Sequence, residues 1–204
     1  HIVASFDNGT LTYYINGAQV GNAVTVAAQS TLEVFGSWLN YSYGIADYMD
    51  DIRVYDTALS AGNVSTLFAG GRMQLTDGLV AKYALDTDAT DSVGSNDGTA
   101  TGVTFESADG RSYVEAPGSN NKIDLGNTSA LNFGTGDFSV SAWVYMNSTT
   151  TGNTSACIIG KGFTSLSSPQ YAGFSLHHHN GDLRFWLGGG GSYSMIDTPQ
   201  GVGE

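Results

Sequence analysis

The sequence of 204 residues predicts an all-β protein built as a sandwich of two antiparallel sheets. Its hydrophobic residues, 41% of the total, fall in short runs of strand length rather than in long helical patterns. The 28 glycines and the abundant serine and threonine separate these runs, as in proteins made of many short strands. Two Asn-Gly pairs, Asn8-Gly9 and Asn16-Gly17, are typical of the tight turns of β-hairpins.

The first third of the chain is predicted to begin as a β-meander and to end in a helix. Strands are expected at 1–7 and 10–15, on either side of the first Asn-Gly turn, and again at 31–35 and 51–55. One short helix is expected near 58–68, where Ser60 is placed to cap it. Val64, Leu67 and Phe68 would then lie on one face of that helix.

A second run of strands follows a linker at 71–77, with a polar loop at 86–102. Strands are expected at 78–85, 111–115, 121–125, 137–146, 156–160, 171–178, 182–187 and 192–196. Alternation places Leu183, Phe185 and Leu187 on one face and Arg184 and Trp186 on the other. Trp143, inside the apolar run 138–146, is predicted to lie in the core.

The charge of the chain excludes several classes of partner. The net charge is −12, with only seven Lys and Arg, so the chain has no basic patch for nucleic acid or for an anionic membrane surface. An acidic surface suits cations, neutral ligands or simple solubility. No apolar run approaches membrane-spanning length, which predicts no membrane insertion. The single cysteine, Cys157, sits in an apolar run and is predicted to be a buried thiol.

An aromatic loop at 36–48 is a candidate ligand-binding site. Flat amphipathic rings stack on sugar faces, and amide or carboxylate groups bond sugar hydroxyls. The alternative is that the rings fold back onto the sandwich as a lid. The candidate ligand-binding residues are Trp38, Asn40, Tyr41, Tyr43 and Asp47, with Tyr48 at the end of the loop.

The histidine run and the glutamates are the residues to consider for metal binding and for catalysis. In His177-His178-His179, strand alternation puts His177 and His179 on one face, where a pair of this spacing can chelate a metal; a solvated strand face is the alternative. The four glutamates are Glu33, Glu106, Glu115 and Glu204, and none has a second carboxylate at the spacing that two-carboxylate glycoside hydrolysis uses. The sequence therefore predicts no enzyme activity.

Several motifs resemble laminin G-like domains, which have the concanavalin A-like jelly-roll sandwich. HIVASFDNGTLTYYINGAQV at 1–20 is similar to the second half of such domains, and MDDIRVYDTALSAGNVSTLFAGG at 49–71 is similar to their closing segment. GLVAKYALD at 78–86, the Asp-Ser-x-Gly-x-Asn-x-Gly loop within 89–105 and FSVSAWVYM at 138–146 resemble their opening half. The closing half thus comes first, at 1–70, and the opening half second, at 78–204.

This swapped order predicts either one circularly permuted domain or halves of two neighbouring domains in a tandem array. In the first case Glu204 and His1 would lie close together. In the second, chains would exchange halves and self-associate head to tail. His1 opens directly into strand-like sequence, as expected of a chain taken from a longer one.

The resemblance also implies a site and a setting. It brings the Asp91 loop to the Asp50-Asp51 corner and so implies a structural calcium site formed by Asp50, Asp51, Asp91 and Asn96. The alternative is that these residues cap turns and keep the surface soluble. The implied function is a non-catalytic extracellular binding or adhesion module, on a cell surface or virion, that recognises a glycan or surface glycoprotein. The alternative function is a structural repeat of an adhesin, fibre or virion protein.

Overall fold

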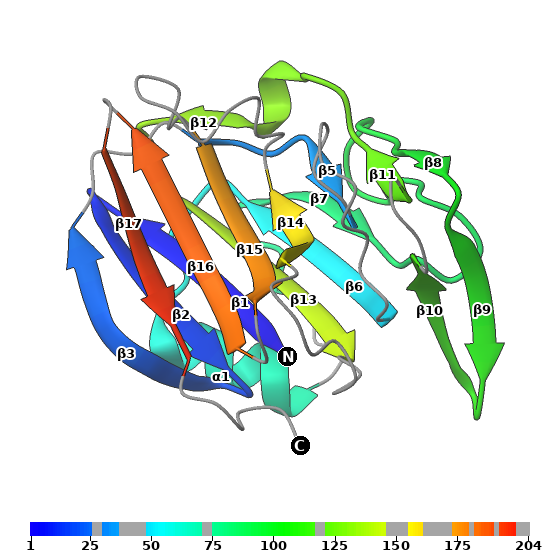
Figure 1. Cartoon of the computed structure of the whole chain (residues 1–204), viewed down its shortest axis with the longest axis horizontal. Coiled ribbons are helices and arrows are strands. Elements are labelled where there is room, and N and C mark those ends of the chain that lie inside the picture. Colours follow the sequence, from blue (N-terminus) through cyan, green and yellow to red (C-terminus); the bar gives the residue numbers. More distant parts are fainter. Residues whose placement is uncertain are drawn as a thin grey trace.

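The computed structural model describes residues 1–25, 30–36, 48–70, 75–116, 121–145, 155–160, 173–179, 182–189 and 192–198. In these residues the fold is mostly β, as the sequence predicts, with two large antiparallel sheets packed face to face (Figure 1). The candidate ligand-binding residues Trp38, Asn40, Tyr41, Tyr43 and Asp47, and also Glu204, lie outside the described residues.

The eight-stranded sheet has the order β3-β2-β1-β13-β6-β10-β9, with β7 also paired to β6. Its strands are β1 (Ile2–Asp7), β2 (Thr10–Ile15), β3 (Ala18–Thr25), β6 (Tyr48–Tyr55), β7 (Leu79–Tyr83), β9 (Thr104–Ala108), β10 (Arg111–Glu115) and β13 (Phe138–Tyr145). Asn8-Gly9 and Asn16-Gly17 connect the first three strands, and all four residues have the positive φ that such turns require.

The seven-stranded sheet has the order β17-β16-β15-β14-β5-β11-β8. Its strands are β5 (Val34–Phe35), β8 (Thr99–Thr101), β11 (Lys122–Asp124), β14 (Ser155–Gly160), β15 (Gly173–His179), β16 (Asp182–Gly189) and β17 (Ser192–Asp197). A small third sheet pairs β4 (Ser30–Thr31) with β12 (Asn132–Gly134), which follows the 3-10 turn η1 (Ser129–Leu131).

Strands from 1–70 and from 78–198 alternate within both large sheets of the single chain. β13 is inserted between β1 and β6, and β5 lies between β14 and β11. Each of the two large sheets is therefore built from strands of both segments. The permuted order relative to the family, and the division into two half-domains, stay predictions.

The main core lies between the two sheets, and the alternation predicted for 183–187 is confirmed. Leu183, Phe185 and Leu187 face the core, whereas Arg184 and Trp186 point to the outer face of the seven-stranded sheet. Trp143 contradicts its prediction. It is only half-buried, on the outer face of the eight-stranded sheet, because the core positions of β13 are Phe138, Val140 and Ala142.

The helix α1 (Ala61–Gly70) covers part of the outer face of the eight-stranded sheet, and a second apolar cluster forms beneath it. This cluster consists of Val3, Tyr14, Tyr55, Leu59, Val64 and Leu67. The predicted cap is confirmed, because the Ser60 hydroxyl accepts the Asn63 N–H at 3.2 Å. Of the three residues predicted to share one face of the helix, Val64 and Leu67 are buried and Phe68 is 37% exposed.

Two buried serines fasten the segment before the helix to the sheet. The Leu59 N–H donates to the Ser5 hydroxyl at 3.0 Å and to the Ser139 hydroxyl at 2.9 Å. The Ser139 hydroxyl in turn donates to the carbonyl of Thr57 at 2.9 Å. These bonds fix where α1 starts on the sheet, and so they also fix where Phe68 ends up. Among the described helices, none has the length and apolar character needed to cross a membrane.

Candidate functional site

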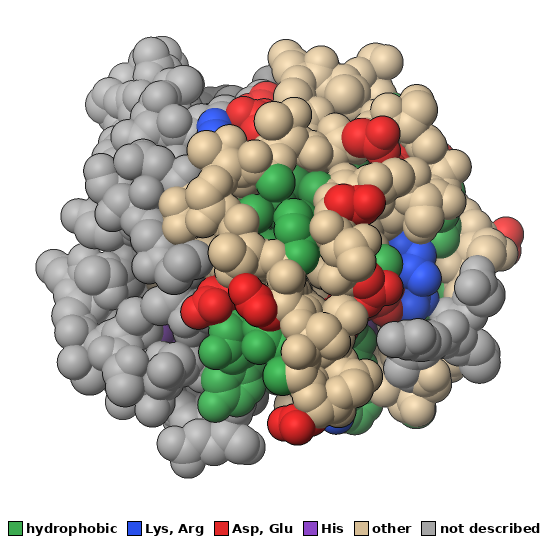
Figure 2. All heavy atoms as spheres, turned by 90° about the vertical axis from the view of Figure 1, so that its right-hand side faces the viewer, with side chains coloured by type: hydrophobic (Ala, Val, Ile, Leu, Met, Phe, Trp, Pro, Cys, Tyr) green, Lys and Arg blue, Asp and Glu red, His purple; other side chains and the backbone are tan. Residues whose placement is uncertain are grey.

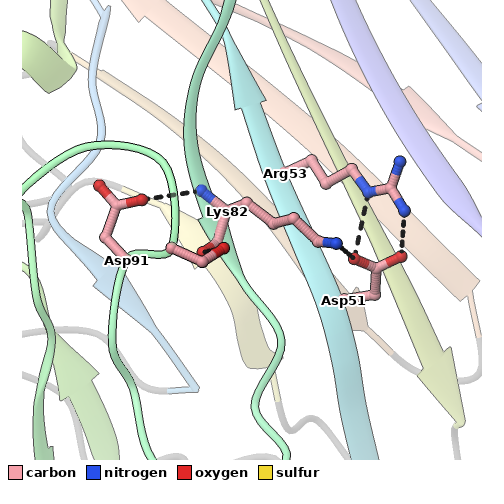
Figure 3. Close-up of polar contacts among 5 residues, drawn as sticks. Asp51, Arg53, Lys82 and Asp91 are labelled. Atoms are coloured by element: carbon pink, nitrogen blue, oxygen red, sulfur yellow. Dashed lines mark hydrogen bonds and ion pairs between the residues drawn. The ribbon is translucent and has the colours of Figure 1, made fainter. Parts of the chain in front are cut away.

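Asp51 occupies a β-bulge in β6 and points its carboxylate at two cations. Asp50 pairs with Trp143 and Arg53 with Ser141, so the register of β6 against β13 shifts between them, and Asp51 has a φ of 45°. The Asp51 carboxylate accepts bonds from the Arg53 guanidinium at 2.6 and 3.1 Å. The ammonium of Lys82 lies 3.8 Å from it (Figure 3).

Asp91 is buried at the centre of the loop whose motif suggested calcium. Its carboxylate accepts hydrogen bonds of 3.0–3.2 Å from four backbone N–H groups and from one side-chain amide. The backbone donors are those of Lys82, Val93, Gly94 and Asn96, and the amide is that of Asn96. Burial acts to raise the pKa of Asp91, but these bonds outweigh it and hold the pKa below its ordinary value of 3.8.

Each fixed position of the Asp-Ser-x-Gly-x-Asn-x-Gly motif has a structural reason. Ser92 connects the loop to β7, because its N–H and its hydroxyl both donate to the carbonyl of Lys82. A Cβ on Gly94 would meet the Asp91 carboxylate at 2.7 Å, and one on Gly98 would collide with Ile123. The carbonyl of Asn96 accepts the buried hydroxyl of Tyr83 at 2.7 Å. The motif therefore encodes a loop that folds around one carboxylate.

The four residues of the suggested calcium site do not form a set of open oxygen ligands. Calcium takes six to eight oxygens, but both Asp91 oxygens face N–H donors and Asp51 faces two cations. Lys82 links the two carboxylates, since its backbone N–H donates to Asp91 and its ammonium forms an ion pair with Asp51 (Figure 3). The described donor set does not fit the ion, and calcium binding stays a prediction of the sequence.

This geometry leads to an expected result for calcium. Because a ligand that binds the native state raises its stability, a calcium site would raise the melting temperature on addition of calcium and lower it with a chelator. We expect differential scanning calorimetry to show no shift in either direction. A rise with calcium that the chelator reverses would contradict this result and support the sequence-based site.

Three tyrosines form a ladder on the outer face of the eight-stranded sheet. Tyr48 is the last aromatic residue of the candidate loop, and it pairs with Tyr145 across β6 and β13. The rings of Tyr48 and Tyr145 stack with centroids 5.6 Å apart, and the rings of Tyr48 and Tyr113 lie 4.4 Å apart. Tyr145 is 63% exposed. The start of β6 and the end of β13 lie side by side at the lower right of the sandwich (Figure 1).

A second group of rings adjoins this ladder. Trp143 lies 5.0 Å from the ring of His1 and 5.9 Å from the ring of Phe68 at the end of α1. His1 is held there by Asn16, whose side-chain oxygen accepts its amino group at 2.9 Å and whose N–H bonds its carbonyl. Trp143 and Tyr145 are two residues apart on β13 and therefore project from the same face.

Together these residues form the aromatic strip, which we define as His1, Tyr48, Phe68, Tyr113, Trp143 and Tyr145; His1 is its buried member, and the other five are half-buried or exposed. Its surroundings are acidic. Burial, Tyr48 and the carboxylates of Glu106 and Glu115 raise the pKa of Tyr113. Acidic side chains are spread over the side of the molecule that carries β8–β11, and hydrophobic patches lie between them (Figure 2).

The sequence does not predict the strip, because the apolar run 138–146 favours a core position for Trp143. The signal was present in the run 138–145. Phe138, Val140 and Ala142 alternate with two serines, so Trp143 and Tyr145 continue the serine face rather than the core face. What the run could not reveal is that Tyr48, Tyr113 and Phe68 arrive beside it from other elements.

The outer face of the seven-stranded sheet carries a different set of polar residues, and most of them are buried. His177 lies opposite Cys157 and Arg184 in register, and its Nδ1 is 3.0 Å from the Ser175 hydroxyl. His178 is buried on the other face, as alternation predicts, and Cys157 is buried as predicted. Within the described ranges, no three His, Cys, Asp or Glu side chains are grouped as metal ligands.

Comparison with known proteins supports the family suggested by the motifs. Residues 1–65 match the family model described as the concanavalin A-like lectin/glucanases superfamily. No curated protein and no solved structure matches the chain. The matched residues supply β1–β6, and these strands are integrated into the two-sheet sandwich. The match to the concanavalin A-like lectin/glucanases superfamily thus covers the first third of the chain, and the two-sheet fold of the described residues is consistent with it.

Proposed function

We propose that this protein is a non-catalytic, extracellular carbohydrate-binding module that recognises a glycan, free or on a surface glycoprotein, through the aromatic strip. The observation that carries the proposal is the tyrosine ladder, in which Tyr145 stays 63% exposed while it stacks on Tyr48. Large exposed rings on a rigid sheet are costly to leave in water, and binding sites use such rings as anchors. The superfamily match is consistent with a binding role.

The chemistry of the strip suits sugars better than purely apolar ligands. The apolar face of a pyranose stacks on an aromatic ring, and its hydroxyls need hydrogen-bond acceptors at the edge of that ring. The strip offers both, because Asp50 lies opposite Trp143 and Glu115 lies opposite Tyr48 in the strand pairing. Paired strands hold most of these rings in place before a ligand binds, and this limits the conformational entropy lost on binding.

The proposal is non-catalytic because the residues for glycoside hydrolysis are not paired in the sequence. None of the four glutamates has a partner carboxylate at the spacing of sandwich glucanases. The fold by itself implies no reaction.

A Tyr145→Ala variant tests the proposal. A glycan array first identifies a bound sugar, and calorimetric titration then compares the variant with the wild type. We expect about tenfold weaker binding, equivalent to about 1.4 kcal/mol, because the most exposed ring of the ladder is lost.

The matched control is Met195→Ala, which removes an apolar side chain of 44% exposure from the outer face of the other sheet. This control should bind like the wild type. Equal binding by Tyr145→Ala and the wild type would place the sugar elsewhere. The absence of any glycan ligand would favour the structural-repeat alternative.

A further inference from the structure

The ladder and the His1–Phe68–Trp143 group share strand β13. Trp143 belongs to one group and Tyr145 to the other, and they lie roughly 7 Å apart along the same face of the strand. Asp50 sits between the groups, since it pairs with Trp143 and lies two residues from Tyr48 on β6. The two groups are therefore parts of one surface that has a carboxylate near its middle.

This surface is elongated across the strands. It begins at Phe68 at the end of α1, beside the buried ring of His1, crosses β13 and β6, and ends at Tyr113 on β10. Because neighbouring strands lie about 4.8 Å apart, the two steps from β13 to β10 cover roughly 10 Å, and the ring of Phe68 on α1 lies 5.9 Å from the ring of Trp143. A single sugar ring covers one aromatic ring, so a surface with rings along this whole length matches several sugars in a row.

The charge around the strip disfavours acidic chains. Asp50, Glu106 and Glu115 lie on this face, and the chain as a whole carries a net charge of −12. Two of the cations on the same face, Arg53 and Lys82, are engaged by Asp51. Arg111, at the hairpin end of β10, lies two residues beyond Tyr113. Carboxylates accept hydrogen bonds from neutral hydroxyls and repel sulfated or carboxylated sugars.

We infer that the aromatic strip binds a linear, neutral polysaccharide lengthwise, with consecutive sugars on the ladder and on the His1–Phe68–Trp143 group. This inference rests on the proposed function and adds the class of ligand to it. A terminal monosaccharide would use the ladder alone, and the second group of rings would add nothing to its binding.

The test measures affinity against chain length by calorimetric titration. The probes are neutral gluco-, xylo-, manno- and galacto-oligosaccharides of two to six units, with oligogalacturonides of the same lengths as the acidic series. For the best neutral series, we expect the affinity to rise at least about tenfold from the shortest to the longest member. The oligogalacturonides should bind at least about tenfold more weakly at low salt.

Variants of the two ring groups locate the effect. Phe68→Ala and Trp143→Ala should flatten the dependence on chain length while the disaccharide affinity stays within about twofold of the wild type. Tyr145→Ala should weaken binding at every length, and Met195→Ala should change nothing. Phe68 is more exposed than Trp143, so the Phe68 variant keeps the test valid if the tryptophan variant fails to fold.

Three results would overturn the inference. If neutral disaccharides and hexasaccharides bind with equal affinity, the module binds glycans but does not contact several consecutive sugars of a chain. If oligogalacturonides bind as tightly as neutral chains, the ligand class is wrong. If the wild type forms a dimer that both Phe68→Ala and Tyr145→Ala dissociate in sedimentation, the strip is a self-association surface. A wild type that binds no sugar at all would instead remove the proposed function itself.

Discussion

Replacing Phe138 by alanine is expected to lower the free energy of unfolding by about 3–5 kcal/mol, as for a phenylalanine that is fully buried in a core. Phe138 is fully buried, and its ring lies 5.6 Å from Phe6, 5.2 Å from Phe133 and 5.1 Å from Phe174. Phe6 belongs to the eight-stranded sheet and Phe174 to the seven-stranded sheet, so the ring joins the two layers. Urea denaturation followed by tryptophan fluorescence measures the loss.

The control for this prediction lies on the same strand. Tyr145→Ala removes an equally large ring from a position that is 63% exposed, and its unfolding midpoint should stay close to that of the wild type. A Phe138→Ala variant as stable as Tyr145→Ala would contradict the description of the core. Stability of the Tyr145 variant also matters for the binding experiments, because it separates loss of the ligand surface from loss of the fold.

Replacing Asp91 by asparagine is expected to destabilise the protein by about 3 kcal/mol, because an amide nitrogen would replace one carboxylate oxygen and leave buried N–H groups without acceptors. In the wild type both oxygens accept N–H bonds, and one of them, Oδ1, serves three backbone donors. Asp88→Asn is the matched control, since Asp88 is an exposed residue of the same loop whose carboxylate bonds to the neighbouring Thr90. It should melt like the wild type.

The effect of Asp91 should depend on pH in a defined direction. The folded protein holds the pKa of Asp91 below the ordinary value of 3.8. A lowered carboxyl pKa contributes stability that is fully present above the unfolded pKa and is lost as the pH falls through the folded pKa. The difference in stability between the wild type and Asp91→Asn should therefore be constant near neutral pH and should shrink below about pH 3.8. A difference that stays constant down to acid unfolding would contradict the role of the ionised carboxylate.

Much of the fold could be read from local patterns. Asn-Gly pairs specify turns because both central residues must take positive φ, and Ser60 specifies the start of α1 because its hydroxyl satisfies an N–H that the helix cannot. The strands β3, β8, β9 and β12 were missed. β3, β8 and β9 are largely exposed and lie at or next to sheet edges, so they carry little of the alternation that marks a half-buried strand.

The candidate sites were harder to predict. The Asp91 motif was recognised, but a sequence does not say whether a carboxylate faces a cation or amide groups. That depends on how the loop closes, and here Gly94 and Gly98 allow the backbone to close on the carboxylate itself. Asp51 was likewise recognised, but the bulge that aims it at Arg53 and Lys82 arises from the pairing of β6 with β13.

The sequence by itself determined the all-β class, the hairpin turns, the capped helix and the face of β16 that enters the core, because each depends on residues within a few positions of one another. Only the tertiary structure decided the aromatic strip. Its rings come from positions as far apart as His1, Phe68 and Tyr145, and they meet because β13 is inserted between β1 and β6 while two serines fix α1 on the sheet. The energy that brings these segments together is the burial of the common core, which no local pattern contains.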